Sequence, residues 1–170
     1  GGTASGKTTS MNAVSLFIPR KSKVVTIEDT REITLPHDNW IQSVTRDSST
    51  GEAKSNIGMS DLLGSALRQR PEYLLVGELR NEPRVADTFF QAMATGHTSY
   101  TTFHADSVET VLSRFGNRPL NVPPQMLREL DIVAVQKQGF SDGKRVRRNT
   151  FVAELGVDRG GGGDRGRRGS

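Results

Sequence analysis

The chain begins with GGTASGKTT, in which Gly1, Gly6, Lys7 and Thr8 match the spacing G-x-x-x-x-G-K-[ST]. Glycines let backbone N–H groups approach a phosphate, and a helix that starts there points its positive end at the same anion. The lysine ammonium of this motif reaches the β- and γ-phosphates of a nucleotide, and the hydroxyl that follows it holds Mg²⁺. We therefore predict a nucleotide site, with Thr8 also a metal ligand, that is built from Gly1, Gly2, Thr3, Ala4, Ser5, Gly6, Lys7, Thr8 and Thr9.

Two short apolar runs end in acidic residues. The first ends in TIED, with Glu28 and Asp29, and the second ends in VGE, with Glu78. In a parallel sheet the carboxyl ends of the strands lie beside the phosphate loop, where a carboxylate binds Mg²⁺ through water or polarises an attacking water. Glu28 and Glu78 are therefore candidate catalytic residues, with Glu78 also a candidate metal residue. An acid that only caps a helix or meets solvent would fit each position taken alone.

Two histidines, His97 and His104, bracket a predicted strand in GHTSYTTFHADS. His104 falls at the carboxyl end of that strand, where the phosphates would lie, and a polar donor there can detect the γ-phosphate and its loss. An ordinary polar role remains the alternative for each histidine. A histidine metal site is not indicated, because no third partner stands at ligand spacing.

Strands alternate with helices in the elements that must position these side chains. We predict one helix from about 6 to 17 and a second that is capped by Ser60 and Asp61. A third helix begins at Pro83 and is closed by Gly96. A fourth is capped by Asp106 or Ser107, and a short fifth covers PPQMLREL. We predict strands over 24–28, 40–46, 73–77 and 98–103, a loop over 46–56, and a final β-hairpin that turns at Asp142-Gly143. This order indicates an α/β fold with a mostly parallel sheet. One domain over 1–155 precedes a Gly/Arg-rich tail, 156–170, that we expect to be disordered.

Composition narrows the class of protein. The chain has 170 residues, 34% hydrophobic and 25% charged, with no cysteine, so disulfide scaffolds and cysteine metal sites are excluded. No apolar run approaches the roughly 20 residues of a membrane span. The net charge of +4 gathers in KRVRR, at 144–148, and in the tail. A solvated cluster is the plain interpretation, and binding to nucleic acid or acidic lipid is the sharper alternative.

Four blocks together resemble one family. GGTASGKTT resembles a Walker A motif, TIEDTREI an aspartate box, and ATGHTSYTTFHADS a histidine box. LLVGELRN resembles an atypical Walker B motif, with Gly-Glu where other ATPases carry Asp-Glu. In this order the blocks are similar to the type II/type IV secretion ATPase family, which drives protein secretion, pilus assembly and retraction, and archaellum rotation. The resemblance covers about 1–155 and is strongest with the archaeal branch.

The resemblance implies a RecA-like P-loop NTPase core that uses ATP and Mg²⁺. Lys7 and Thr8 would bind phosphates and the metal, Glu28 would position or activate water, and Glu78 would hold Mg²⁺ through water. His104 would contact the γ-phosphate, while His97, Asp29 and Arg80 would support the site or a subunit contact. The family also implies a cytoplasmic homo-hexamer that docks at the inner face of the membrane on a polytopic platform protein.

Two departures from the family pattern accompany the resemblance. The family has a strand and an N-terminal domain before the phosphate loop, and its members lack a tail of this composition. We therefore expect the first core strand to be missing and the chain to be the ATPase part of a longer protein, marginally stable and weakly active alone. A nucleotide-binding remnant without turnover and a RecA-like nucleic-acid translocase remain as alternatives, although nucleic acid is the less favoured partner.

Overall fold

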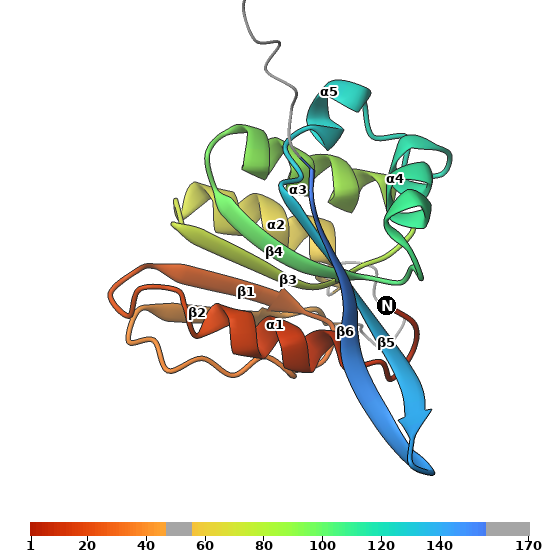
Figure 1. Cartoon of the computed structure of the whole chain (residues 1–170). Helices are drawn as coiled ribbons and strands as arrows, with labels where there is room; N and C mark the ends of the chain where they lie inside the picture. The colour runs from red at the N-terminus through yellow and green to blue at the C-terminus, as the bar shows by residue number, and fades with distance from the viewer. Residues whose placement is uncertain (47–55, 156–170) are drawn as a thin grey trace, which may run out of the picture.

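Four parallel strands form the main sheet of the computed structural model, which describes residues 1–46 and 56–155 (Figure 1). Their order across the sheet is β2-β1-β3-β4. The strands are β1 (Val24–Glu28), β2 (Trp40–Val44), β3 (Tyr73–Leu79) and β4 (Thr98–Phe103). The helices are α1 (Lys7–Ser15), α2 (Met59–Arg68), α3 (Pro83–Ala94), α4 (Val108–Gly116) and α5 (Pro124–Leu127). The predicted α/β fold with a mostly parallel sheet is confirmed.

Alternating side chains build a core on each face of this sheet. Val25, Leu74 and Val76 pack with buried residues of α2, α3 and α4 in the larger core. Val24 and Leu75, one position along from residues of that core, pack with Met11 of α1 in the smaller core. Successive side chains of a strand point to opposite faces of the sheet, so α1 packs on one face and α2, α3 and α4 pack on the other. The same period turns Thr26 and Glu28 of β1 toward the α1 side, with Val24.

A long antiparallel hairpin, β5 (Ile132–Ser141) and β6 (Lys144–Glu154), forms a second sheet that extends beyond the body of the domain (Figure 1). Asp142 and Gly143 at its turn both have positive φ, 51° and 73°. Two left-handed residues are the conformation that matches the twist of a tight hairpin, and Asp-Gly favours it. The predicted C-terminal hairpin and its turn are confirmed.

Several predicted boundaries need correction. Helix α1 ends at Ser15, and α2 is capped by Gly58 rather than by Ser60. Asp61 does take part in that cap, because its carboxylate accepts the Gly58 N–H at 3.1 Å. Strand β2 is shorter than predicted, ending at Val44. The predicted tail and residues 47–55 of the predicted loop lie outside the described residues.

An apolar groove separates β4 from β5. It has a volume of 380 Å³, and its walls are mostly side chains of β4, β5, α1, α3 and α4. Gly1 also lines it, and its amino group donates to Phe103 O at 3.3 Å. In the part of the chain that the structure describes, no helix has the length and apolarity that a membrane crossing requires.

Candidate nucleotide-binding site

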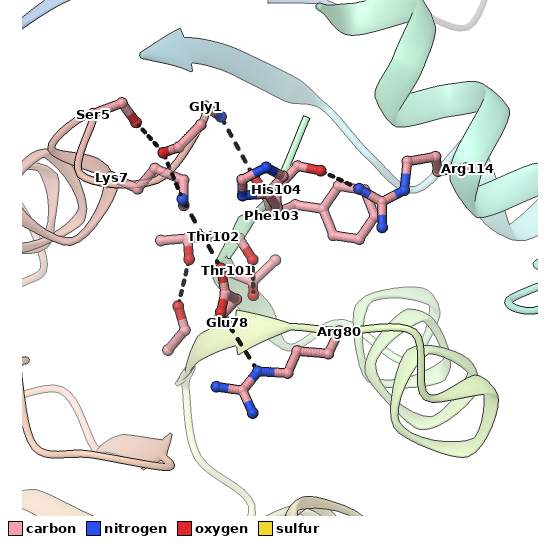
Figure 2. A network of polar contacts seen from close by, with 12 residues as sticks. Gly1, Ser5, Lys7, Glu78, Arg80, Thr101, Thr102, Phe103, His104 and Arg114 are labelled. Carbon is pink, nitrogen blue, oxygen red and sulfur yellow. Dashed lines mark hydrogen bonds and ion pairs between the residues drawn. The ribbon is translucent and has the colours of Figure 1, made fainter. Parts of the chain in front are cut away.

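The loop before α1 turns through two residues in the left-handed conformation. Ala4 and Gly6 have φ of 54° and 92°, and the helix begins directly after Gly6. Glycine adopts the left-handed conformation at little cost because it has no Cβ, which explains the glycine at the start of the helix. The Ser5 hydroxyl and the Lys7 ammonium both donate to Gly2 O, at 2.8 and 3.0 Å (Figure 2). The loop therefore closes on itself, with its last residues at the positive end of α1.

A cavity of 860 Å³ lies in front of this loop and brings together most of the predicted site. The predicted residues that line it are Thr3, Ala4, Ser5, Gly6, Lys7, Thr8, Thr9, Glu28, Asp29, Glu78, Arg80 and His104. Gly1 and Gly2 are not in its lining. Gly2 instead supplies the carbonyl that the loop folds around. The carboxyl ends of β1, β3 and β4 thus converge on the loop, as expected for a parallel sheet.

Glu28 is the most deeply held acid of the cavity, with only 2% of its surface exposed. One carboxylate oxygen accepts the backbone N–H groups of Glu32 and Ile33, at 2.9 and 2.8 Å. The other accepts the Gln42 side-chain amide at 3.3 Å. A carboxylate offers about four lone-pair sites, so room remains for one further donor such as water.

Gly77 of β3 makes room for this buried acid. A Cβ at residue 77 would lie 3.3 Å from Glu28 Cγ, tighter than ordinary contact. The pairing of β3 with β4 shifts register between Val76 and Leu79, and the Thr102 hydroxyl donates to Gly77 O at 2.7 Å. An irregularity of this kind re-aims side chains next to functional sites. The glycine of the Walker B-like block therefore gives the buried Glu28 side chain room that a larger residue would reduce.

A chain of ion pairs crosses the floor of the cavity. Lys7 Nζ lies 3.9 Å from a Glu78 oxygen, and Arg80 lies 3.5 Å from Glu78 and 3.1 Å from Asp29. Figure 2 shows Lys7 and Arg80 approaching Glu78 from opposite sides. Because these side chains are partly exposed, solvent screens the pairs and each contributes little to stability. These ion pairs hold Lys7 and Glu78 close together, at the place where phosphates and a metal ion would bind.

His104 follows β4 directly and is exposed at the cavity edge. Arg114 of α4 donates to the His104 carbonyl and, at 2.9 Å, to Asn81 Oδ1. Its guanidinium also lies 4.7 Å from the centroid of the Phe103 ring (Figure 2). Arg114 therefore joins the segment after β4 to the segment after β3. Sequence reasoning missed it because its position depends on how α4 packs, which no local motif signals.

His97 lies apart from the site, at the amino end of β4. Its Nδ1 is 3.1 Å from Ala92 O and 3.2 Å from the Thr95 hydroxyl, so it closes the end of α3. It does not line the cavity. A second residue that sequence reasoning missed, Arg147 of β6, does line it. Arg147 belongs to the KRVRR cluster at 144–148, for which the sequence indicated only a concentration of positive charge.

The acid after His104 has a shifted titration. The Thr110 hydroxyl donates to the Asp106 carboxylate at 2.9 Å, and this hydrogen bond lowers the pKa of Asp106 below its ordinary value. Asp106 precedes the Ser107 cap of α4, whose side chain accepts the Thr110 N–H. The segment after His104 is therefore held by side chains at the start of α4.

The donor set of the cavity fits a magnesium nucleotide. No group of three or more His, Cys, Asp or Glu side chains within 1–46 and 56–155 is placed to hold a metal ion. Mg²⁺ usually keeps several waters and takes its remaining ligands from one or two protein oxygens and the substrate phosphates. The Thr8 hydroxyl and the Glu78 carboxylate, which line one cavity, suit that requirement.

Comparisons with known proteins agree with this geometry. Residues 1–138 match the family model described as Type II/IV secretion system protein. An uncharacterised protein of Methanocaldococcus jannaschii is 48% identical over 155 residues, 91% of this chain and 56% of the relative. The crystal structure of the VirB11 ATPase from the Brucella suis type IV secretion system in complex with sulphate superposes with a TM-score of 0.71 at 31% identity. That match covers 90% of this chain and 46% of the VirB11 chain.

A pilus protein gives a similar match. The crystal structure of the pilus retraction motor PilT with bound ADP has a TM-score of 0.66 at 28% identity, over 86% of this chain and 43% of PilT. The chain thus spans about half the length of these relatives. The phosphate loop, the converging acids and the family match lead to one conclusion. The chain belongs to the type II/IV secretion system protein family.

Proposed function

We propose that residues 1–155 form a RecA-like ATPase domain whose ATP hydrolysis powers a secretion, pilus or archaellum machine. The observation that carries this proposal is the single cavity shared by Lys7, Glu28, Glu78 and His104. The four residues come from α1, β1, β3 and the segment after β4, which are far apart in sequence. Solved relatives support the proposal, since one is called an ATPase and the other a motor with bound ADP.

Each residue has a role that follows from its position. Loop N–H groups and Lys7 would bind the β- and γ-phosphates, and Thr8 and Glu78 would hold Mg²⁺, which neutralises phosphate charge when bound. Glu28, fixed by three hydrogen bonds, would orient the attacking water on the remaining lone pair. His104, at the exposed edge, would contact the γ-phosphate, and Arg80 and Asp29 would support Glu78.

The working form that we propose is a homo-hexamer. It would be cytoplasmic and would dock on a polytopic platform protein at the inner face of the membrane. Exposed apolar side chains at the end of α1 support an assembly, because Leu16 and Phe17 are 62% and 88% exposed. Large neighbouring apolar residues on a surface are typical of a contact with another protein. His97, away from the cavity, is proposed to act at such a contact.

ATP hydrolysis tests the proposal directly. We expect the chain to bind ATP with Mg²⁺ and release phosphate, and Glu78→Gln to abolish turnover while binding persists. Glu129→Gln, at an exposed acid outside the cavity, is the matched control and should behave as the unaltered chain. Light scattering with and without ATP would measure assembly. Binding without turnover, in this chain and in a longer form that carries a relative's N-terminal half, would replace the motor by a nucleotide-binding role.

A nucleic-acid translocase is the second candidate, and the hairpin is the observation that favours it. Lys144, Arg145 and Arg148 are exposed on β6. Basic side chains on a projecting element suit a phosphate backbone. Stimulation of turnover by single-stranded DNA, lost on raising the salt concentration, would favour this candidate. Turnover that is indifferent to DNA would exclude it.

A further inference from the structure

Arg147 brings the C-terminal hairpin into contact with the phosphate loop. Its Nε donates to Ala4 O at 2.8 Å, although 142 residues separate the two in the chain. A Cβ at Gly6 would lie 3.3 Å from Arg147 Cδ and 3.5 Å from Gln136 Nε2. Two hairpin side chains therefore lie against the loop, one from each strand.

A β-bulge in β6 explains why Arg147 faces this way. Val135 pairs with Phe151, but Gln136 pairs with Asn149, so Thr150 is the extra residue. In a regular strand Ala153, Phe151, Asn149 and Arg147 would share one face. The bulge moves Asn149 and Arg147 to the opposite face, with Gln136, and leaves Arg148 on the other side. The face of β6 that meets the loop is therefore set by one inserted residue.

Arg147 also differs from the other cations of the cavity in its free donors. Lys7 is bound to Gly2 O and lies near Glu78, Arg80 is paired with two acids, and Arg114 is held by Asn81. Within 1–46 and 56–155, the Arg147 side chain has no acidic partner, and its only hydrogen bond uses Nε. Its two terminal nitrogens are left to donate into the cavity that it lines. A guanidinium with free, parallel donors is the side chain best suited to phosphate oxygens.

We propose that Arg147 is a nucleotide-binding residue that contacts the α- and β-phosphates from the hairpin. This inference rests on the proposed function and names a residue outside all four sequence blocks. The position along the polyphosphate follows from the arrangement of the cavity. Glu78 and His104 mark its γ-phosphate end, whereas Arg147 lies against Ala4 and Gly6 of the loop itself.

Nucleotide titration of the 170-residue chain tests this, with ATP, ADP and AMP measured separately by calorimetry. We expect Arg147→Ala to weaken the affinity for ATP and the affinity for ADP by the same factor, about 10- to 100-fold, because one charged hydrogen-bonding group is lost. Arg147→Lys should recover only part of the affinity, because lysine keeps the positive charge but lacks the paired, coplanar N–H donors of the guanidinium. Arg148→Ala is the matched control, one residue along and on the opposite face, and should change affinity less than twofold. Thermal melts of all variants should coincide, because Arg147 is exposed.

The outcomes separate this inference from the function on which it rests. If the unaltered chain binds no nucleotide, both are overturned. If it binds ATP and Arg147→Ala binds equally well, the Arg147 inference alone fails. Equal losses in Arg147→Ala and Arg148→Ala would replace a specific contact by general electrostatics. A loss confined to ATP would overturn the assignment to the α- and β-phosphates.

Discussion

At the residue scale, the two glutamates of the cavity are held in opposite ways. Glu28 is buried and accepts hydrogen bonds from two backbone N–H groups and one side-chain amide. Glu78 is half-buried, and its carboxylate lies 3.9 Å from Lys7 and 3.5 Å from Arg80. A fixed carboxylate suits the orientation of a water, and a movable one suits a metal that arrives with its nucleotide. The two acids are therefore not interchangeable.

Glu28→Gln should separate turnover from binding. We expect hydrolysis to fall by about 100-fold or more, because the amide lacks the charge that polarises water. Its oxygen still accepts the N–H groups of Glu32 and Ile33, so the loop and the Kd for ATP should change little. Steady-state kinetics and calorimetry would measure both, with Glu129→Gln as control. Normal turnover in Glu28→Gln would remove Glu28 from the chemistry.

Arg114 should matter for stability as well as for activity. Replacement by alanine removes the donors to His104 O and Asn81 and the contact with Phe103. We expect the free energy of unfolding to fall by about 1–3 kcal/mol. Turnover should fall too, because His104 loses its link to the segment after β3. Denaturant melts and kinetics would test this against Arg128→Ala, an exposed arginine outside the cavity; equal behaviour of the two variants would contradict it.

At the element scale, the irregular pairing of β3 with β4 should depend on Thr102. Its hydroxyl donates to Gly77 O at 2.7 Å, within the register shift between Val76 and Leu79. Thr102→Val keeps the shape and removes this buried hydrogen bond next to Glu28, at a cost of about 1–3 kcal/mol. Chemical denaturation would measure the loss. Thr98→Val, at the exposed start of the same strand, should cost far less, and a similar cost at both sites would refute the argument.

The start of α4 should show a pH dependence. The Thr110 hydroxyl bonds the ionised Asp106, so the folded pKa lies below the unfolded one. The stabilisation is therefore present above the unfolded value, about 4, and is lost as pH falls through the lower folded value. An NMR titration of Asp106 should shift upward toward its ordinary midpoint in Thr110→Val. An unchanged midpoint in that variant would show that the hydroxyl is not the cause.

Helices and strands of the core were predictable because their signals are local. Apolar runs marked β1 and β3, and Asp-Gly marked the hairpin turn. Much of the site followed as well, since the phosphate loop is contiguous and the acids end strands. Arg114 and Arg147 were not predictable, because α4 packing places the first and a bulge in β6 turns the second. Neither helix packing nor a β-bulge produces a residue spacing that can be recognised in a single sequence.

At the scale of the whole molecule, the groove between β4 and β5 separates the two sheets. Its lining is largely apolar, and among the described residues β4 is the outermost strand of the main sheet on that side. Gly1 lines it beside Phe103, and a Cβ at Gly1 would lie 2.2 Å from Gln136 O. The Gly1 backbone therefore lies close to both β4 and β5. No β-ladder joins β4 to β5 within 1–46 and 56–155, so the hairpin and the main sheet meet through the side chains that line this groove.

An extended segment ahead of Gly1 should strengthen that connection. We expect about six β-branched residues, a typical strand length, to pair with β4 and fill the groove. The melting temperature should rise by several degrees relative to the 170-residue chain. An extension of the same length that alternates Gly and Ser is the control. Equal melting of the two extensions would mean that the groove does not accept a strand.

The contact between Glu28 and Gly77 limits which side chains residue 77 can accept. A Cβ at residue 77 would lie 3.3 Å from Glu28 Cγ, so a larger residue there, including the aspartate of the Asp-Glu pair in other ATPases, requires the buried glutamate to shift by a few tenths of an ångström. The three hydrogen bonds that hold Glu28 oppose such a shift. The residue types at positions 28 and 77 are therefore coupled, although two different strands contribute them.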